Sequence, residues 1–102
     1  MNKISNCEEK VMKIIWDATE DPDLRTTMNA VNEKFGFNWK PQTVSTFLAR
    51  LIGKGFLTSY RKGRYAYYVP EISLEDYRRE QINELVKLLY NGDVDAAKKD
   101  LK

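Results

Sequence analysis

The chain has 102 residues and a net charge of +2, with 42% hydrophobic and 31% charged residues, so it can form one domain with a short appended element. No apolar run approaches the roughly 18 residues of a membrane span. The lack of histidine excludes Ser-His-Asp triads and histidine metal sites, and a single cysteine excludes an internal disulfide and a cysteine-rich zinc site.

A helix is expected near the N-terminus. Ser5 and Glu8 have the spacing of a capping box, in which each side chain accepts from the other residue's backbone N–H. Val11, Ile14 and Ile15 follow at helical spacing. The acidic, proline-containing run at 20–23 then reads as a loop.

A short strand and a second helix are predicted next. Residues 24–26 are assigned to a three-residue strand, and Thr26 or Thr27 to the cap of a helix that ends at Gly36. Met28, Val31 and Phe35 provide the apolar face of this helix.

A third helix is predicted to begin at Pro41, which suits the first helical position, and to end at Lys54, before Gly55. Its buried stripe is expected to consist of Val44, Phe47, Leu48 and Leu51. A hairpin of residues 56–61 and 65–69 follows, with Gly63 in the turn and Pro70 at the end of the second strand.

A last long helix is expected to begin after Ser73 and to close at Asn91 and Gly92, with one more short helix in the tail at 93–102. Its apolar stripe consists of Ile82, Leu85, Val86 and Leu89. We therefore expect a domain at 1–70 and a C-terminal helical segment at 71–102.

The order helix, strand, helix, helix, hairpin predicts a mainly α fold with a small antiparallel sheet, the winged helix-turn-helix. In this fold the third helix enters the major groove of DNA and the hairpin lies beside it. The basic charge agrees, because no acidic residue occurs between Glu33 and Glu71. The basic residues of this stretch are Lys34, Lys40, Arg50, Lys54, Arg61, Lys62 and Arg64.

Thr43, Thr46 and Arg50 form one exposed ridge at positions i, i+3 and i+7 of the third helix. Hydroxyl groups suit phosphates and base edges, and arginine can bind guanine with two donors. The predicted double-stranded DNA contacts are Lys40, Gln42, Thr43, Ser45, Thr46, Arg50 and Lys54 on the third helix, and Arg61, Lys62 and Arg64 on the hairpin. The alternative is that these are ordinary solvent-exposed polar positions and solubilising charges.

Three segments together resemble the BlaI/MecI/CopY penicillinase-repressor family. They are residues 9–17, residues 39–57 from Trp39-Lys40-Pro41 to Lys54-Gly55-Phe56-Leu57, and residues 64–70, and the resemblance covers about residues 4 to 90. It implies a winged-helix repressor that binds a palindromic operator as a homodimer. It places Thr43, Thr46 and Arg50 on the operator, and Ile82, Leu85, Val86 and Leu89 in the dimer contact. A stripe that packs on its own domain is the alternative for the last helix.

The resemblance is incomplete at the C-terminus. Family members usually run some twenty residues further, which implies either a weaker dimer or a truncated sequence. The cleavage segment of the antibiotic-resistance members has no clear counterpart, and the cysteine-rich motif of the copper-responsive members is missing. The inducing signal and any regulatory protease are therefore unassigned.

Two other functions are considered. A winged-helix module that binds protein would carry an apolar patch on its third helix in place of Thr43, Thr46 and Arg50. An enzyme is not expected, because there is neither histidine nor a glycine-rich phosphate loop, and no paired carboxylates flank a predicted cleft. No cofactor or metal is expected. The N-terminus lacks the apolar core of a signal peptide, which predicts a cytoplasmic protein.

Overall fold

The computed structural model describes residues 2–101, and the chain divides into two compact units between Ile72 and Ser73. The first unit contains α1 (Asn6–Asp17), α2 (Leu24–Phe35), α3 (Pro41–Gly53), β1 (Leu57–Lys62) and β2 (Tyr65–Pro70). The second contains α4 (Leu74–Leu89) and α5 (Val94–Lys99). The expected mainly α fold with a small antiparallel sheet is confirmed.

The predicted capping box begins α1. The Ser5 hydroxyl accepts from the Glu8 backbone N–H at 3.1 Å, and the Glu8 carboxylate accepts from the Ser5 backbone N–H at 2.7 Å. Both donors belong to the group that a helix N-terminus cannot satisfy internally. The helix starts where this reciprocal pair places it.

The three-residue strand predicted at 24–26 is wrong, and so is the cap at Thr26 or Thr27. Leu24 begins α2, and Asp23 is its cap, with the Asp23 carboxylate accepting from the Thr26 backbone N–H at 2.8 Å. That hydrogen bond, aided by the bond from the Thr26 side chain, lowers the pKa of Asp23. The Asp23 cap fixes the helix start three residues earlier than a cap at Thr26 and four earlier than one at Thr27, which leaves no extended residues for a strand.

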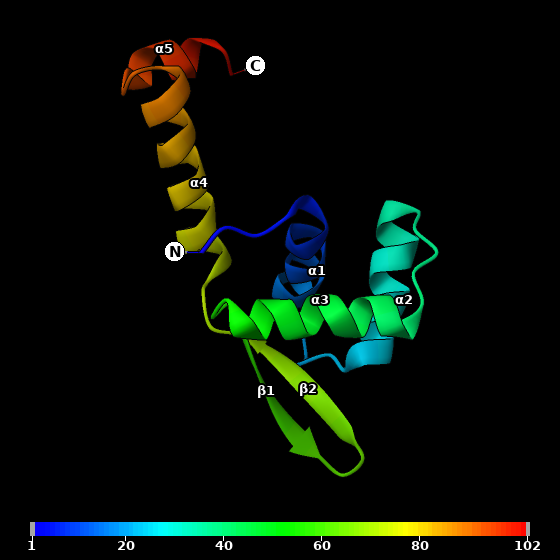
Figure 1. Cartoon of the computed structure of the whole chain (residues 1–102). Coiled ribbons are helices and arrows are strands. Elements are labelled where there is room, and N and C mark those ends of the chain that lie inside the picture. The colour runs from blue at the N-terminus through cyan, green and yellow to red at the C-terminus, as the bar shows by residue number, and fades with distance from the viewer. Residues whose placement is uncertain (1, 102) are drawn as a thin grey trace. The chain divides into compact units, whose positions relative to one another are not determined.

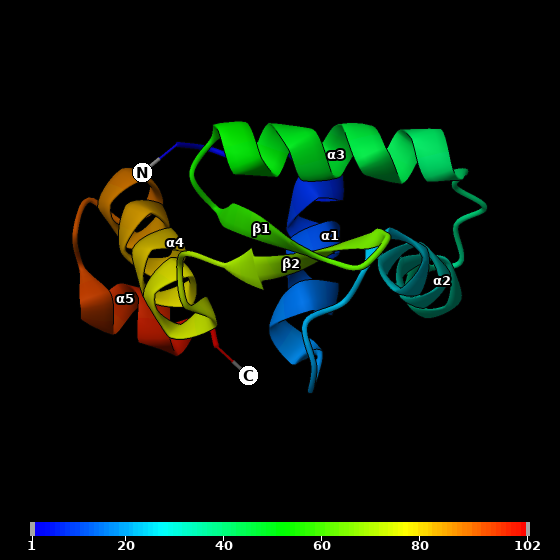
Figure 2. The same ribbon diagram turned by 90° about the horizontal axis from the view of Figure 1, so that it is seen from below.

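The three helices of the first unit pack around one core, and α3 lies across α1 (Figure 1 and Figure 2). Val11 and Met12 of α1 and Val44 and Leu51 of α3 are fully buried in it. The expected stripe on α3 is confirmed except at Phe47, which is half-buried. Burying each such side chain contributes about 1.5–3 kcal/mol to the stability of the fold. Packing on α1 therefore holds α3 in place.

The hairpin follows α3 and projects away from the three helices (Figure 1). The strands pair antiparallel, with Lys62 opposite Tyr65, so two residues form the turn. The first of them is Gly63, whose φ of 66° lies in the left-handed region that favours glycine. Phe56 and Leu57 are buried and anchor the base of the hairpin in the core.

In the second unit, Ser73 caps α4 and accepts from the Asp76 backbone N–H at 3.0 Å. The Gly92 backbone N–H donates to the Val86 carbonyl at 3.0 Å and closes the helix where Asn91 and Gly92 were expected to close it. The expected short helix in the tail is α5, capped by Asp93. The Tyr90 hydroxyl and the Asp100 carboxylate lie 2.6 Å apart and connect the two helices.

Candidate nucleic-acid interface

The exposed face of α3 is the candidate site. Gln42, Ser45, Thr46 and Arg50 are exposed, Thr43 is half-buried, and Lys40 is the exposed N-cap residue. The structure therefore places the ridge predicted from Thr43, Thr46 and Arg50 toward solvent, on the side opposite the core stripe. A polar helix face free of carboxylates can approach a nucleic-acid groove without electrostatic repulsion.

Thr46 and Arg50 on the ridge each contact a neighbouring residue of α3. The Thr46 hydroxyl donates to the Gln42 carbonyl at 3.0 Å, so its proton is already used and its oxygen remains an acceptor. The Arg50 guanidinium lies 5.9 Å from the centre of the Phe47 ring. This cation–π contact holds the guanidinium beside α3, and the residue remains exposed to solvent.

The turn that leads into α3 is fixed by a side chain of α2. The Asn32 amide donates to the Trp39 carbonyl at 3.0 Å and accepts from the Trp39 backbone N–H at 2.9 Å. Trp39 also stacks on Phe37 at 4.6 Å and lies 5.0 Å from Phe47, between ring centres. The N-terminal end of α3 is thus held by Asn32, a residue that the sequence reasoning did not single out.

The basic side chains of the hairpin gather at its turn. Arg61, Lys62 and Arg64 are all exposed, and the Arg61 guanidinium donates to the Arg64 carbonyl at 2.9 Å across the turn. Tyr65, beside the turn, is 57% exposed. The tip of the hairpin therefore presents three cations and one aromatic ring.

The middle of the hairpin is joined to the loop before α2. The Tyr68 backbone N–H donates to the Pro22 carbonyl at 3.0 Å, and the Tyr60 hydroxyl donates to the Asp21 carboxylate at 2.9 Å. Tyr60 also stacks on Tyr67, its cross-strand partner, at 5.6 Å. These contacts position the wing against the helices, and they join segments too distant in sequence for spacing to reveal.

Lys54 lies apart from the other predicted contacts. It is the C-cap residue of α3, at the opposite end of the helix from Gln42, and its ammonium group lies 2.7 Å from the Glu8 carboxylate. A lysine with a protein partner is less available to phosphate than Arg50 or Lys62. Its DNA contact stays a prediction.

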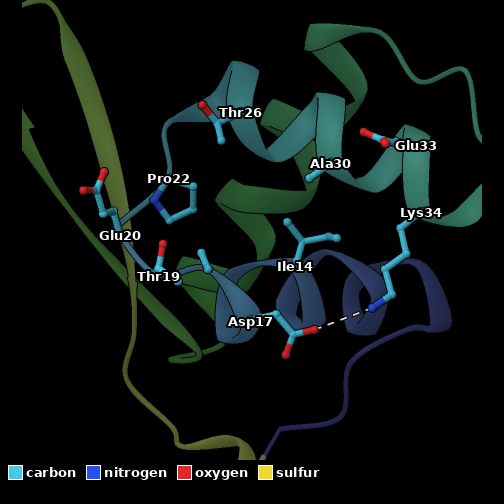
Figure 3. Close-up of a pocket in the computed structure, with 10 residues that line it drawn as sticks. Ile14, Asp17, Thr19, Glu20, Pro22, Thr26, Ala30, Glu33 and Lys34 are labelled. Carbon is cyan, nitrogen blue, oxygen red and sulfur yellow. Dashed lines mark ion pairs between the residues drawn. The ribbon is translucent and has the colours of Figure 1, made fainter.

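A shallow hollow lies between α1 and α2, with Ile14, Ala30 and Pro22 among its lining residues (Figure 3). Asp17 and Lys34 face each other across it with a nitrogen–oxygen distance of 3.6 Å. The hydrogen bond from Lys13 is the main cause that lowers the pKa of Asp17. None of the residues predicted to contact DNA lines this hollow, so it is separate from the candidate interface.

The predicted dimer residues on α4 fall into two groups. Ile82, Leu85 and Leu89 are 60%, 48% and 68% exposed, whereas Val86 is only 9% exposed within the single chain. Leu88, which the sequence reasoning did not include, is 78% exposed. An amphipathic helix with this much apolar surface in water is typical of a protein contact.

Residues 2–101 contain no helix long and apolar enough to cross a bilayer. Nor does that part of the chain contain a cluster of acidic or cysteine side chains able to hold a metal ion.

A helix-turn-helix with an acid-free exposed ridge, followed by a cationic wing, defines a winged-helix protein of the DNA-binding class. Residues 4–100 match the penicillinase repressor family. The chain belongs to this family, whose members are transcriptional repressors. A penicillinase repressor of Bacillus licheniformis is 33% identical over 90 residues, which cover 88% of this chain and 68% of the relative. The methicillin resistance regulatory protein MecI of Staphylococcus aureus is 25% identical over 91 residues, covering 88% and 71%.

Two solved structures of BlaI share the fold. The DNA-binding domain of that repressor is 35% identical and superposes with a TM-score of 0.62, covering 76% of this chain and 94% of the domain. Monomeric BlaI of Bacillus licheniformis in complex with the blaP half-operator is 34% identical, with a TM-score of 0.60 and coverage of 74% and 89%. The resemblance to the penicillinase repressors expected from the sequence is confirmed.

Proposed function

We propose that this repressor binds a palindromic operator in double-stranded DNA as a homodimer and blocks transcription by occupying the promoter region. The observation that carries this proposal is the coincidence of the acid-free stretch at 34–70 with the turn, α3 and the hairpin. A solved relative in complex with a half-operator supports it, since a half-operator is the share of one subunit in a two-fold site.

The two elements have different roles in this proposal. Gln42, Thr43, Ser45, Thr46 and Arg50 face the major groove, and Arg50 is the residue best suited to read a guanine. The contacts assigned to phosphates are Lys40 at the start of α3 and Arg61, Lys62 and Arg64 on the wing. Such contacts orient the protein on the duplex without reading sequence.

The homodimer is assigned to α4. Ile82, Leu85 and Leu89 supply its exposed apolar face, and Leu88 adds to it. Val86 is already buried within the chain and is assigned to internal packing as much as to the dimer. In this proposal, residues 1–70 are the DNA-binding domain and residues 71–102 are the dimerisation segment. The protein acts in the cytoplasm, the compartment that holds the DNA. No catalytic step is part of this function.

Binding-site selection tests the proposal. The purified chain is incubated with randomised duplex DNA, and the bound fraction is recovered and sequenced. We expect an inverted repeat with half-sites about one helical turn, roughly 10 bp, apart or a multiple of that spacing. The four phosphate contacts assigned to each subunit correspond to a slope of about −7 for the salt dependence of the dimer's affinity, and about six per subunit would give a slope on the order of −10.

An absence of enrichment at low salt, with the protein folded, would contradict the proposal and favour a winged-helix module that binds protein. Enrichment of a single half-site without a repeat would support DNA binding and contradict the dimer.

A further inference from the structure

Glu8 is a buried charge that its capping role does not explain. Its side chain is 2% exposed, whereas a glutamate is seldom buried this completely unless it has a partner. One carboxylate oxygen, Oε1, lies 2.7 Å from both the Ser5 backbone nitrogen and the Lys54 ammonium nitrogen. The other, Oε2, is buried without a hydrogen-bond partner among the described residues. A carboxylate in such a place depends on its lysine partner.

Lys54 lies where α3 ends. Its backbone N–H donates to the Arg50 carbonyl at 2.9 Å, and its own carbonyl accepts from the Asn2 amide at 3.2 Å. A cation at a helix C-terminus and an anion at a helix N-terminus both interact favourably with the helix dipole. The Glu8–Lys54 pair therefore joins the positive end of α1 to the negative end of α3.

The other end of α3 is held in a comparable way, because Asn32 of α2 bonds both backbone groups of Trp39. The exposed ridge lies between these two attachments. Arg50 lies one turn before Lys54, and its carbonyl accepts from the Lys54 backbone N–H. A change at the C-terminal attachment would therefore be passed directly to Arg50. If Lys54 bound a phosphate in place of Glu8, Glu8 would remain buried without its charge partner, which costs a large free energy.

We propose that Glu8 and Lys54 are positioning residues that set the recognition helix against the DNA, and that Lys54 acts by holding Glu8 and not by binding phosphate. The inference rests on the proposed DNA binding.

The test uses three variants of the full chain and one control. Glu8→Gln keeps the size of the side chain and removes its charge, Lys54→Met removes the cation, and Glu8→Gln/Lys54→Met removes both and leaves no buried charge unpaired. Lys62→Met, in an exposed wing lysine assigned to phosphate, is the matched control. Affinity is measured for the selected duplex and for a random duplex of equal length, at several salt concentrations and at a temperature where circular dichroism shows every variant folded.

We expect Glu8→Gln to weaken binding to the selected duplex by about fivefold, an effect typical of residues that act without touching the ligand. Its affinity for the random duplex and its salt slope should not change. Lys54→Met and the double variant should also keep the wild-type slope. Lys62→Met should lower the slope by about one per subunit on both duplexes.

Two results of the binding measurements would overturn the proposal. Tighter binding and a steeper slope in Glu8→Gln would show that a released Lys54 binds phosphate, and a loss of slope in Lys54→Met equal to that in Lys62→Met would show the same. A wild-type protein that does not distinguish the two duplexes would contradict the proposed function itself.

Amide hydrogen exchange on the free protein tests the positioning role without DNA. The Lys54 and Phe56 amides, which bond to the Arg50 and Leu51 carbonyls, should exchange faster in Glu8→Gln, while the Thr27 amide on α2 should not. Unchanged exchange at Lys54 and Phe56 would overturn the proposal even if DNA binding were weakened.

Discussion

Arg50 and Thr46 are neighbours on the exposed ridge of α3, but their hydrogen-bonding capacity differs. The Thr46 hydroxyl already donates to the Gln42 carbonyl, so it can offer DNA only an acceptor and a methyl group. Arg50 has five N–H donors on a planar fork, and its described contact is with the face of the Phe47 ring. Of the two, Arg50 is the residue able to select a base by paired donation.

We therefore expect Arg50→Ala to remove sequence preference at one position of each half-site, a loss of about 1–3 kcal/mol, with little change in thermal melting because the side chain is exposed. Arg50→Lys is the matched variant, since it keeps the charge and loses the fork. It should lose the same preference while retaining the salt slope that Arg50→Ala reduces. The sequence preference and the salt slope are both measured by salt titrations of labelled duplexes. An equal loss of melting temperature and binding would instead make Arg50 structural.

Glu8 makes the fold sensitive to acid. Burial raises the pKa of its carboxyl group, but hydrogen bonds from Lys54 and Ser5 outweigh burial, so the pKa is lowered from its ordinary value of 4.5. A lowered pKa in the folded state means that this group stabilises the fold above about pH 4.5, and that the contribution is lost as the pH falls through the folded-state pKa.

The free energy of unfolding should therefore fall more steeply as the pH is lowered below about 4.5 in the wild type than in Glu8→Gln. Urea denaturation at several pH values measures it. Asp17 and Asp23 also have lowered pKa values, and they are present in both proteins, so the difference between the two curves isolates Glu8. Parallel curves would contradict the assignment.

The two elements of the candidate interface, α3 and the hairpin, are held in place by residues of other elements. The N-cap of α3 makes no side-chain capping bond, and the turn before it is held by Asn32 of α2. The wing is likewise held near its middle by Pro22 and Asp21, in the loop that precedes α2. Helix α2 and its preceding loop thus support both elements of the candidate interface.

Asn32→Ala should lower the free energy of unfolding by about 1–3 kcal/mol, because it leaves two partly buried backbone groups of Trp39 without their partners. Asn29→Ala, at an exposed position of the same helix, is the control and should change stability by about 0.5 kcal/mol or less. Urea denaturation followed by tryptophan fluorescence compares the two. Similar values for both variants would mean that the turn is held by its aromatic stack alone.

At the scale of the whole molecule, the two units have different surfaces. Among the described residues of the first unit, Ile52 is the one large aliphatic side chain that is exposed, at 40%. The second unit leaves Ile82, Leu85, Leu88 and Leu89 in water. A helix of this kind is marginal in isolation and is stabilised when a partner covers its apolar face. The surface of α4 is thus the one on which the proposed homodimer depends.

Leu89→Glu should shift the protein from dimer to monomer and weaken operator binding, because it places a charge in the apolar contact. Asn83→Glu adds the same charge at an exposed polar position of α4 and should leave the dimer intact. Sedimentation equilibrium of both variants gives the association state. If the Leu89→Glu variant is still a dimer, the dimer contact lies on another surface.

The sequence by itself determined the features that depend on neighbours in the chain. The capping box at Ser5 and Glu8, the start of α3 at Pro41, the glycine turn of the hairpin and the cap of α4 at Ser73 are all local, and the structure confirms each one. The ridge on α3 also follows from helical periodicity, because a buried stripe defines the opposite face. The predicted start of α2 was wrong because Asp23 and Thr26 are both residue types that cap helices well, and local preference does not decide between them.

Only the tertiary structure decided which distant residues meet. Glu8 and Lys54 are 46 positions apart, and Tyr60 and Asp21 are 39 apart. Neither pair has a spacing that a helix or strand would reveal. The same holds for burial, since Val86 and Leu85 are adjacent on an apolar stripe yet only Leu85 is left in solvent. Periodicity gives the face on which a side chain lies, whereas its partner is set by how the elements pack.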